Sequence, residues 1–343
     1  MKAALYRDVG KIGITEVERQ VPPEGFVEVQ VKQAGICGSD LHSYFGNWGQ
    51  SHTRAHGHET CGIVTAVGAG VRDFQLGDRV TIECFSHCGA CLYCETGLYN
   101  QCLNRKGVSH EQHGGFAEYT VAHASGIFKI PDGMSDEEGA LVEPLAVGVR
   151  AVAQAEATHA DRVLVVGGGT IGLLCLAVAK AVGVKECLIT AKYPQQVEIA
   201  KELGADHVIN LSQENVREVI NERTHNLGID VVIETVGSAS AFDDAIAVVR
   251  KRGRVVLVAG YHKPLEVDLT RIVWSEATIT GSNCYGYSGF QTDFDAAIEL
   301  IASGKVDATK IVTHRFPLDD VSQAFQVAAD KETGSVKVHL VVE

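Results

Sequence analysis

The segment Gly167-Gly168-Gly169-Thr170-Ile171-Gly172 is the feature that most restricts how this chain can fold. It directly follows the apolar run 162–166 and precedes the helix-like run 171–182. Glycines at this spacing allow a tight turn, a close approach of the backbone to a pyrophosphate, and close packing of a helix whose amino end favours an anion. The pattern predicts a dinucleotide-binding loop, and the alternative is a purely structural glycine turn. The expected cofactor residues here are Gly167, Gly169, Thr170, Ile171 and Gly172.

Apolar strands alternate with helices from residue 162 to about residue 281, which is typical of a parallel doubly wound α/β sheet. The strands are expected at 162–166, 187–190, 208–210, 231–234, 255–258 and 279–281, and the helices at 171–182, 195–203, 215–224 and 239–249.

The first hundred or so residues follow a different pattern. Val27–Lys32 alternates between apolar and polar residues, and 62–68 and 79–82 are further strand-like runs. An alternation of apolar and polar residues with a period of two, together with frequent glycine, predicts a small, mostly β domain. We expect a tail, with a helix near 290–303 and a strand near 337–342, to return and pack on this domain. The expected domains are therefore 1–147 with 285–343, and 148–284.

Length and charge limit the possible partners. The chain has 343 residues, enough for about two domains, because single cores stop growing at roughly 250–300 residues. Its formal net charge of −13 argues against nucleic acid or an anionic membrane as a partner. Charges near the start disfavour a signal peptide, and the longest apolar run, 171–179, is about half of a membrane span. We therefore expect a cytoplasmic protein with a small-molecule substrate.

Four cysteines form the strongest local motif, Cys88-x2-Cys91-x2-Cys94-x7-Cys102, called the zinc lobe here and expected at about residues 84–105. Four thiolates at this spacing match a closed, tetrahedral structural zinc site. The alternatives are a redox dithiol or an iron–sulfur ligand run. Zinc is favoured because the loop lacks other regular structure and its glycines let the chain wrap around an ion.

A second candidate metal site combines Cys37 with His58 and Glu59 of the segment Gly57–Gly62. Thiolate, imidazole and carboxylate are the side chains that most often hold zinc, and a catalytic site uses three of them with one position open. The histidines His52, His56, His110 and His113 are not interpreted as further ligands, because isolated loop histidines usually have no such role.

Together these motifs resemble the zinc-dependent alcohol dehydrogenases of the medium-chain dehydrogenase/reductase family, most closely the polyol (sorbitol) and threonine dehydrogenase branch. The segment Cys37–His42, Gly57-His58-Glu59 with Gly62, Gly68 and Val71, the zinc lobe and the glycine loop occur in the expected order. The resemblance covers essentially the whole chain. It implies a GroES-like, mostly β catalytic domain, split between the N-terminal part and the tail, around a central Rossmann domain, with the active site in a cleft.

The resemblance also implies roles for individual residues. Cys37, His58 and Glu59 would hold the catalytic zinc, and Glu143 would bind it directly or through water. The alternative for Glu143 is an ordinary hinge glutamate. Ser39 and His42 would carry the proton released by the alcohol, so the expected catalytic residues are Ser39, His42 and Glu59. Asp40 would orient one of them or cap a helix. By position alone, the pocket walls are expected to include Tyr44, Phe45, Asn47 and Trp48, or these residues only pack the loop.

The end of the second nucleotide-domain strand predicts the choice of cofactor. An acidic residue there would bind the ribose 2′-hydroxyl of NAD and repel a 2′-phosphate. This chain has Thr190-Ala191-Lys192-Tyr193-Pro194-Gln195-Gln196, without a carboxylate. Ala191 leaves room and Lys192 supplies a positive charge, so NADP is favoured over NAD, with Gln196 as a further cofactor residue. The alternative is that Lys192 is only a solvated loop lysine.

The resulting hypothesis is an oxidoreductase that contains two zinc ions per chain, one catalytic and one structural. It would transfer a hydride between a secondary alcohol, such as a polyol or diol, and a nicotinamide cofactor. The alternatives are a threonine- or aminocyclitol-type zinc dehydrogenase, or a non-catalytic dinucleotide-binding protein. Relatives imply a homodimer or homotetramer.

Overall fold

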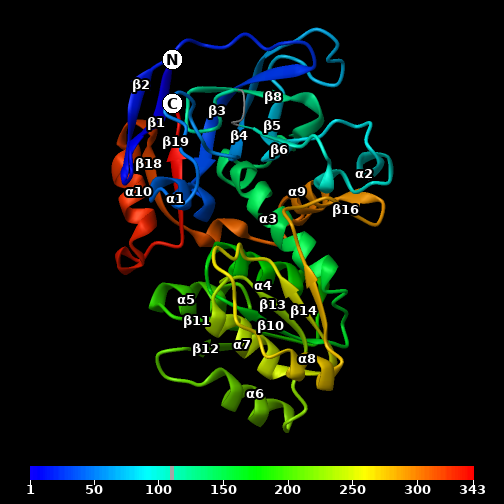
Figure 1. Ribbon diagram of the computed structural model, residues 1–343. Helices are drawn as coiled ribbons and strands as arrows, with labels where there is room; N and C mark the ends of the chain where they lie inside the picture. Colours follow the sequence, from blue (N-terminus) through cyan, green and yellow to red (C-terminus); the bar gives the residue numbers. More distant parts are fainter. Residues whose placement is uncertain (109–111) are drawn as a thin grey trace. The chain divides into compact units, whose positions relative to one another are not determined.

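The computed structural model describes residues 1–108 and 112–343, which divide into two compact units (Figure 1). Unit 1 comprises Met1–Glu143, Ala297–Ser303 and Val312–Glu343, and unit 2 comprises Pro144–Ala296 and Gly304–Ile311. Residues 144–147, 285–296 and 304–311 thus belong to unit 2, whereas the sequence places them with the first domain. One boundary lies within helix α3 (Asp136–Gln154), between Glu143 and Pro144.

Unit 2 is built on a six-stranded sheet in which all neighbouring strands run parallel. The spatial order is β12-β11-β10-β13-β14-β15, so the direction of strand addition reverses between β10 and β13. The strands are β10 (Arg162–Val166), β11 (Glu186–Ala191), β12 (His207–Asn210), β13 (Ile229–Glu234), β14 (Val249–Leu257) and β15 (Thr278–Gly281). Each overlaps an apolar run identified in the sequence, which confirms the doubly wound α/β fold.

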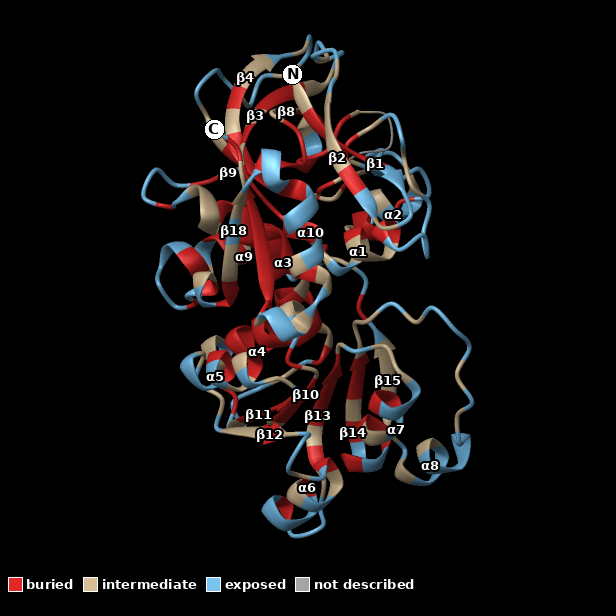
Figure 2. Ribbon diagram, turned by 90° about the vertical axis from the view of Figure 1, so that its left-hand side faces the viewer, coloured by how far each residue is buried: buried red, intermediate tan, exposed pale blue. Residues whose placement is uncertain are grey.

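The helices of unit 2 pack on this sheet in two groups. Helix α4 (Thr170–Val182) packs on β10 and β11 beside α5 (Pro194–Glu202). Helix α7 (Ala239–Val248) packs on β13 and β14 beside α6 (Val216–Thr224) and α8 (Leu269–Ser275). The sequence does not predict α8, because its apolar side chains form no buried stripe. Leu269, Val273 and Trp274 are all exposed, whereas the central strands are buried (Figure 2).

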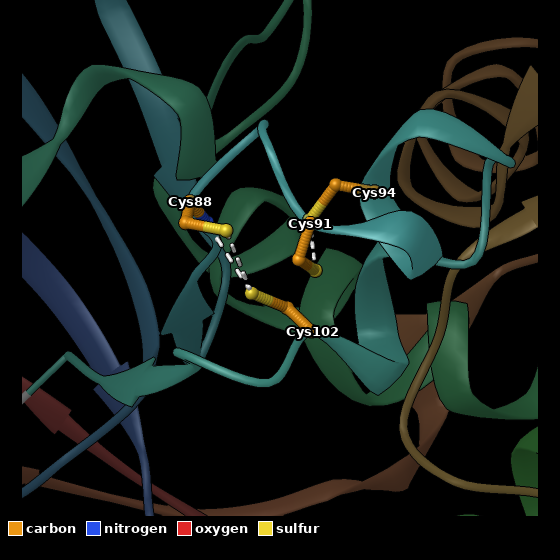
Figure 3. Close-up of side chains that lie close together, drawn as sticks. All are labelled: Cys88, Cys91, Cys94 and Cys102. Atoms are coloured by element: carbon orange, nitrogen blue, oxygen red, sulfur yellow. Dashed lines mark hydrogen bonds between the residues drawn. The ribbon is translucent and has the colours of Figure 1, made fainter.

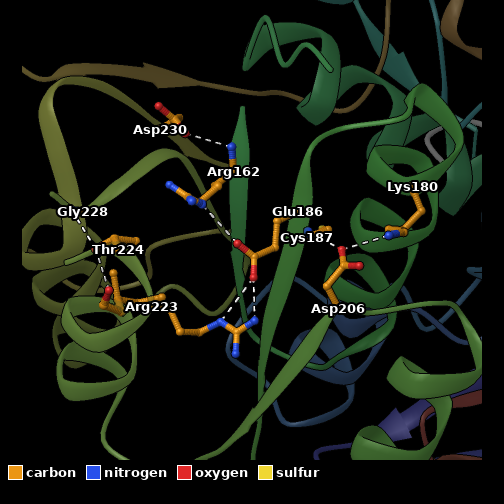
Figure 4. A network of polar contacts seen from close by, with 10 residues as sticks. Arg162, Lys180, Glu186, Cys187, Asp206, Arg223, Thr224, Gly228 and Asp230 are labelled. Carbon is orange, nitrogen blue, oxygen red and sulfur yellow. Dashed lines mark hydrogen bonds and ion pairs between the residues drawn. The ribbon is translucent and has the colours of Figure 1, made fainter. Parts of the chain in front are cut away.

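A polar network ties together the amino ends of the strands in unit 2 (Figure 4). Glu186, at the start of β11, accepts hydrogen bonds from Arg162 Nε (3.1 Å) and Arg223 Nη2 (2.6 Å). Asp206 accepts from Lys180 Nζ (2.8 Å) and from the backbone N–H of Cys187 (2.7 Å). These contacts stabilise the edge of the sheet opposite to the carboxyl edge, where ligands bind in such folds.

Unit 1 contains a seven-stranded sheet of order β18-β19-β3-β4-β5-β9, with β8 also paired to β3. These strands are β3 (Phe26–Gly35), β4 (Glu59–Val67), β5 (Arg79–Ile82), β8 (Tyr119–His123), β9 (Ile127–Lys129), β18 (Val312–Pro317) and β19 (Lys337–Val341). Two-stranded pairs are formed by β1 (Lys2–Asp8) with β2 (Lys11–Glu16) and by β6 (Phe85–Ser86) with β7 (Lys106–Gly107). The tail strand β19 pairs antiparallel with β3, so distant parts of the chain share one sheet.

The core of unit 1 fixes the helix that follows β3. Helix α10 (Val321–Ala329), which the sequence analysis does not identify, buries Phe325 completely. The Phe325 ring lies 5.3 Å from the Tyr44 ring of α1 (Gly38–Tyr44) and 5.6 Å from the Phe116 ring, between ring centres. Tyr44 therefore belongs to this core, and its expected place in a pocket wall is wrong. Burial of these rings anchors α1 against the sheet.

The remaining elements are short. Helix α2 (Leu92–Glu95) lies in the zinc lobe, and helix α9 (Asp293–Ala302) follows the hairpin of β16 (Tyr287–Ser288) and β17 (Gln291–Thr292). Within the described part of the chain, no helix has the length and apolar character that crossing a membrane requires.

Candidate active site and dinucleotide pocket

Cys37, His58 and Glu59 converge in unit 1. Strands β3 and β4 pair antiparallel with Gly35 opposite Glu59, and this register brings Cys37, two residues beyond Gly35, close to the start of β4. One potential ligand atom from each of the three side chains lies within 4.8 Å of the others. A thiolate, an imidazole and a carboxylate at such separations are a donor set that zinc can bind.

Asp40 supports two members of this cluster. Its Oδ2 accepts a hydrogen bond of 2.9 Å from the backbone N–H of Cys37, which caps α1, and its Oδ1 lies 3.9 Å from His58 Nδ1. The helix-capping alternative is therefore confirmed, with His58 as an additional neighbour. Burial alone would lower the pKa of His58, but the negative charges of Asp40 and Cys37 raise it well above its usual value. At 3.9 Å the Asp40 oxygen is beyond hydrogen-bond distance of His58, so the interaction between the two side chains is electrostatic.

Lys337 is the residue of this site that the sequence analysis misses. Its ammonium group lies 2.6 Å from Oε1 and 2.5 Å from Oε2 of Glu59, and also donates to the backbone oxygen of Ile36 at 3.1 Å. Both side chains of the ion pair are only 1% exposed. Gly35 leaves space for the Glu59 side chain of this ion pair, because a Cβ at position 35 would lie 1.9 Å from Glu59 Oε2. A lysine at the start of the strand-like run 337–342 was the available signal.

Glu143 lies near the cluster without belonging to it. The side chain is buried, and its charge contributes to raising the pKa values of His58 and Lys337. It is absent from the group of Cys37, His58 and Glu59 whose ligand atoms approach within 4.8 Å. The structure thus places a third acidic side chain close enough to act electrostatically on this site.

Ser39 and His42 are three residues apart on α1, and both are half-buried. The His42 ring contacts the Trp48 ring at 5.2 Å between centres, and the backbone oxygen of His42 accepts from the N–H of Asn47 at 2.9 Å. Phe45 and Trp48 are 49% and 44% exposed, so their side chains remain accessible, unlike that of Tyr44.

The four cysteines of the zinc lobe also converge (Figure 3). The Sγ atoms of Cys91 and Cys94 are 3.5 Å apart, as are those of Cys88 and Cys102, and all four lie within 4.8 Å of one another. Hydrogen bonding from the Ala90 amide is the main cause that lowers the pKa of Cys88 to about 6. Four sulfur atoms in this arrangement suit a closed tetrahedral zinc site.

No other group of metal-ligand type occurs within residues 1–108 and 112–343. His52 Nδ1 instead lies 2.9 Å from the backbone oxygen of Tyr6, and His113 Nδ1 accepts from the N–H of Ala55 at 3.1 Å. His56 packs edge-on against the Tyr6 ring. His110 lies outside the described residues.

The glycine loop of unit 2 joins β10 to α4 and borders a cavity of about 350 Å³. Gly167 has φ +110°, and a Cβ there would lie 2.6 Å from Val236 Cγ2. A Cβ at Gly172 would lie 1.8 Å from the Gly167 oxygen, so the loop and helix pack too closely for any other residue. Gly169 is the N-cap of α4, followed by Thr170 and Ile171 in its first turn. This is the geometry that a pyrophosphate requires.

The end of β11 forms another wall of the same cavity. Lys192 and Gln196 line it, whereas Ala191 is buried. Gln196 Oε1 accepts hydrogen bonds from the N–H groups of Lys192 (3.0 Å) and Tyr193 (3.3 Å), so it shapes the turn after β11. Asp244 also lines the cavity, but its carboxylate is paired with Arg217 Nε at 2.9 Å.

Comparison with known proteins identifies the family. Residues 23–132 match the alcohol dehydrogenase GroES-like domain, and residues 170–303 match the zinc-binding dehydrogenase domain. Sorbitol dehydrogenase of Halalkalibacterium halodurans is 35% identical to this chain over 99% of both proteins. The chain belongs to the zinc-dependent alcohol dehydrogenases of the medium-chain dehydrogenase/reductase family.

Solved structures of this family extend the comparison to cofactors. An alcohol dehydrogenase from Escherichia coli CFT073, complexed with NADH, has a TM-score of 0.91 at 31% identity and covers 99% of each chain. A zinc-binding dehydrogenase from Sinorhizobium meliloti 1021, bound to NADP, has a TM-score of 0.90 at 29% identity and covers 99% of this chain and 98% of its own. The expected enzyme class, a zinc-containing, NAD(P)-dependent alcohol dehydrogenase of the sorbitol and threonine dehydrogenase-like branch, is therefore confirmed.

Proposed function

We propose that this dehydrogenase oxidises a secondary hydroxyl group of a polyol, diol or similar polar alcohol to the ketone, reversibly and with NADP as the preferred hydride acceptor. The convergence of Cys37, His58 and Glu59 within 4.8 Å carries the proposal. The similarity to a sorbitol dehydrogenase supports the polyol class. A zinc ion bound at this cluster would act as a Lewis acid that lowers the pKa of the alcohol.

The protein residues around this cluster have distinct roles in the proposal. Cys37 and His58 hold the zinc, with Glu59 as a third ligand and Glu143 binding directly or through a water molecule. Asp40 accepts from the Cys37 N–H and acts on His58 through its charge. Lys337 competes with the metal for the Glu59 carboxylate, because both of its oxygens contact the ammonium group. Each carboxylate oxygen has two lone pairs, so Glu59 would keep an acceptor site for zinc without leaving Lys337, and the competition is between the charges of the ion and the ammonium group.

The proton released by the alcohol leaves along α1 in this proposal. Ser39 accepts it from the substrate and His42 passes it toward solvent. Their spacing of three residues places the two side chains on one face of the helix. The half-buried state of both residues suits a path between an enclosed site and water.

The zinc lobe would hold the second zinc ion through Cys88, Cys91, Cys94 and Cys102. With all four positions occupied by sulfur, that ion has no open site for a substrate and stabilises the loop. We therefore propose two zinc ions per chain, one at each cluster.

The preference for NADP rests on the turn after β11. Lys192 is a cation that lines the cavity, and Ala191 presents no carboxylate to repel a 2′-phosphate. Titration of the wild-type protein should show tighter binding of NADPH than of NADH. Lys192→Ala should weaken NADPH binding about 5–10-fold, the size of one charge-assisted contact, and leave NADH binding unchanged. Tighter binding of NADH by the wild type would contradict this preference.

We further propose a homodimer or homotetramer in the cytoplasm. Strand β15 forms one edge of the parallel sheet, and exposed Trp274 and Val273 lie on the nearby helix α8. Edge strands and exposed apolar side chains are surfaces that oligomers cover. None of the ten cysteines, all of which lie in the described part of the chain, forms a disulfide, as expected in a reducing compartment. Light scattering of the purified protein tests the oligomeric state.

The decisive experiment for the proposed function is Cys37→Ser. This variant should lose turnover by at least about 1,000-fold and lose one zinc ion per chain, while dinucleotide binding in unit 2 is largely retained. Cys284→Ser, which alters a thiol in neither metal cluster, is the matched control and should leave all three properties intact. Near-normal activity of Cys37→Ser would refute the assignment.

The substrate itself requires a panel of alcohols. Polyols, vicinal diols and β-hydroxy amino acids, each assayed with NAD and NADP, separate the polyol proposal from a threonine- or aminocyclitol-type activity. A protein that binds dinucleotide and contains both zinc ions, yet oxidises none of them, would contradict the proposed substrate class.

A further inference from the structure

Glu234, the last residue of β13, is a fully buried carboxylate at the carboxyl edge of the sheet in unit 2. A buried carboxylate is costly unless hydrogen bonds satisfy it. Its Oε1 accepts from the backbone N–H groups of Val236 (2.7 Å) and Gly237 (2.9 Å), and its Oε2 accepts from the Tyr261 hydroxyl at 2.5 Å. All three donors are uncharged groups.

These hydrogen bonds connect two loops. Val236 and Gly237 belong to the loop 235–238 after β13, and Tyr261 belongs to the loop 258–261 after β14. The loops also touch through their backbones, because Gly237 has φ +75° and a Cβ there would lie 2.8 Å from the oxygen of Gly260. Glu234 therefore holds both loops in one arrangement.

The first of these loops borders the dinucleotide cavity. Thr235, Val236 and Ser238 line the same cavity as the glycine loop. Doubly wound sheets of this kind consist of two mononucleotide-binding halves. The half formed by β10 to β12 carries the glycine loop, which faces the pyrophosphate, and the ribose-discriminating turn, which faces the adenosine ribose. The half formed by β13 to β15 is consequently left for the nicotinamide part.

We propose that Glu234 and Tyr261 are positioning residues for the nicotinamide half of the cofactor, acting through the loops 235–238 and 258–261. This inference rests on the proposed nicotinamide-dependent function. The carboxylate and the hydroxyl order the two loops before the cofactor arrives, so that less conformational entropy is lost on binding. Neither side chain needs to touch the cofactor for this effect.

The test compares the whole cofactor with its adenosine half. Binding to zinc-loaded protein is measured by calorimetry for NADPH and for 2′-phospho-AMP, or for NADH and AMP if the wild type prefers those. Tyr261→Phe removes only the hydroxyl group. It should weaken binding of the whole cofactor by up to about 10–150-fold, the limit set by one lost hydrogen bond to a charged group, and weaken binding of the adenosine half clearly less.

Two further variants make the result specific. Glu234→Gln keeps an acceptor for Val236 and Gly237 but presents Tyr261 with an amide N–H that donates to the hydroxyl oxygen, so only a neutral hydrogen bond remains and the variant should show a smaller loss of the same selectivity. Tyr287→Phe, which removes the hydroxyl of a 45% exposed tyrosine elsewhere in unit 2, is the control and should bind both ligands normally.

The outcomes separate the two proposals. Equal weakening of both ligands, with a lowered melting temperature, would reveal a merely structural role and overturn the inference, as would no weakening at all. A wild-type protein that binds neither nicotinamide dinucleotide would overturn the proposed function itself.

Discussion

Replacing Lys337 with methionine tests the buried ion pair beneath the candidate metal site. Both partners are 1% exposed, so the Glu59 carboxylate would lose its neutralising charge in a site closed to water. Breaking a buried pair in this way costs about 3–5 kcal/mol, because one charge stays buried and uncompensated. For a unit of this size, that corresponds to a decrease of about 6–20 °C in melting temperature.

Differential scanning calorimetry of the zinc-free protein is the appropriate assay, since a metal ion would itself compensate Glu59. The double variant Lys337→Met/Glu59→Gln removes both charges, and it should be about 2–3 kcal/mol more stable than the sum of the single variants implies. Lys2→Met, which breaks an exposed ion pair with Asp319, is the control in unit 1 and should leave the transition nearly unchanged.

Added zinc extends the test to the metal site. It should stabilise Lys337→Met more than the wild type, because the ion then compensates the Glu59 charge that Lys337 no longer neutralises. A melting temperature within 2 °C of the wild type, or losses in the double variant that simply add, would refute the reasoning that this pair is a coupled unit.

Two further predictions concern unit 1. Cys88→Ser should reduce the zinc content from two ions to one per chain, measured by atomic emission, and lower the melting temperature, while an unchanged zinc content would contradict the Cys₄ site. Glu28, whose pKa is lowered mainly by hydrogen bonding from Arg19, contributes stability that is present above its unfolded value of about 4.5. This contribution is lost as the pH falls below about 5 and through the folded pKa. Glu28→Gln should therefore flatten the acid side of a stability-against-pH curve measured by urea unfolding, and an unchanged slope would contradict this role.

Local patterns in the sequence were sufficient to locate most of the architecture. The apolar runs in unit 2 predict all six strands of the parallel sheet, because buried parallel strands are nearly continuously hydrophobic. Helix α8 is not predicted from the sequence, because its apolar side chains Val273 and Trp274 are exposed and form no buried face. For Tyr44, position in the sequence was misleading. Its place near Cys37 suggests a pocket wall, but its ring packs in the core against Phe325, which is far away in the sequence.

The sequence by itself determined which chemical groups are available and which of them lie close together along the chain. These are the four cysteines of the zinc lobe, the glycine loop, and the pair His58 and Glu59 with Cys37 upstream. Spacing is informative there because a short segment can wrap an ion or a phosphate without help from the rest of the chain.

Only the tertiary structure decided which polar side chains meet across long separations. Lys337 reaches Glu59 because β19 joins the sheet beside β3, and Tyr261 reaches Glu234 because β14 lies next to β13. No local periodicity encodes these pairs. Their partners are selected by strand order and register, and burial then makes each hydrogen bond costly to lose.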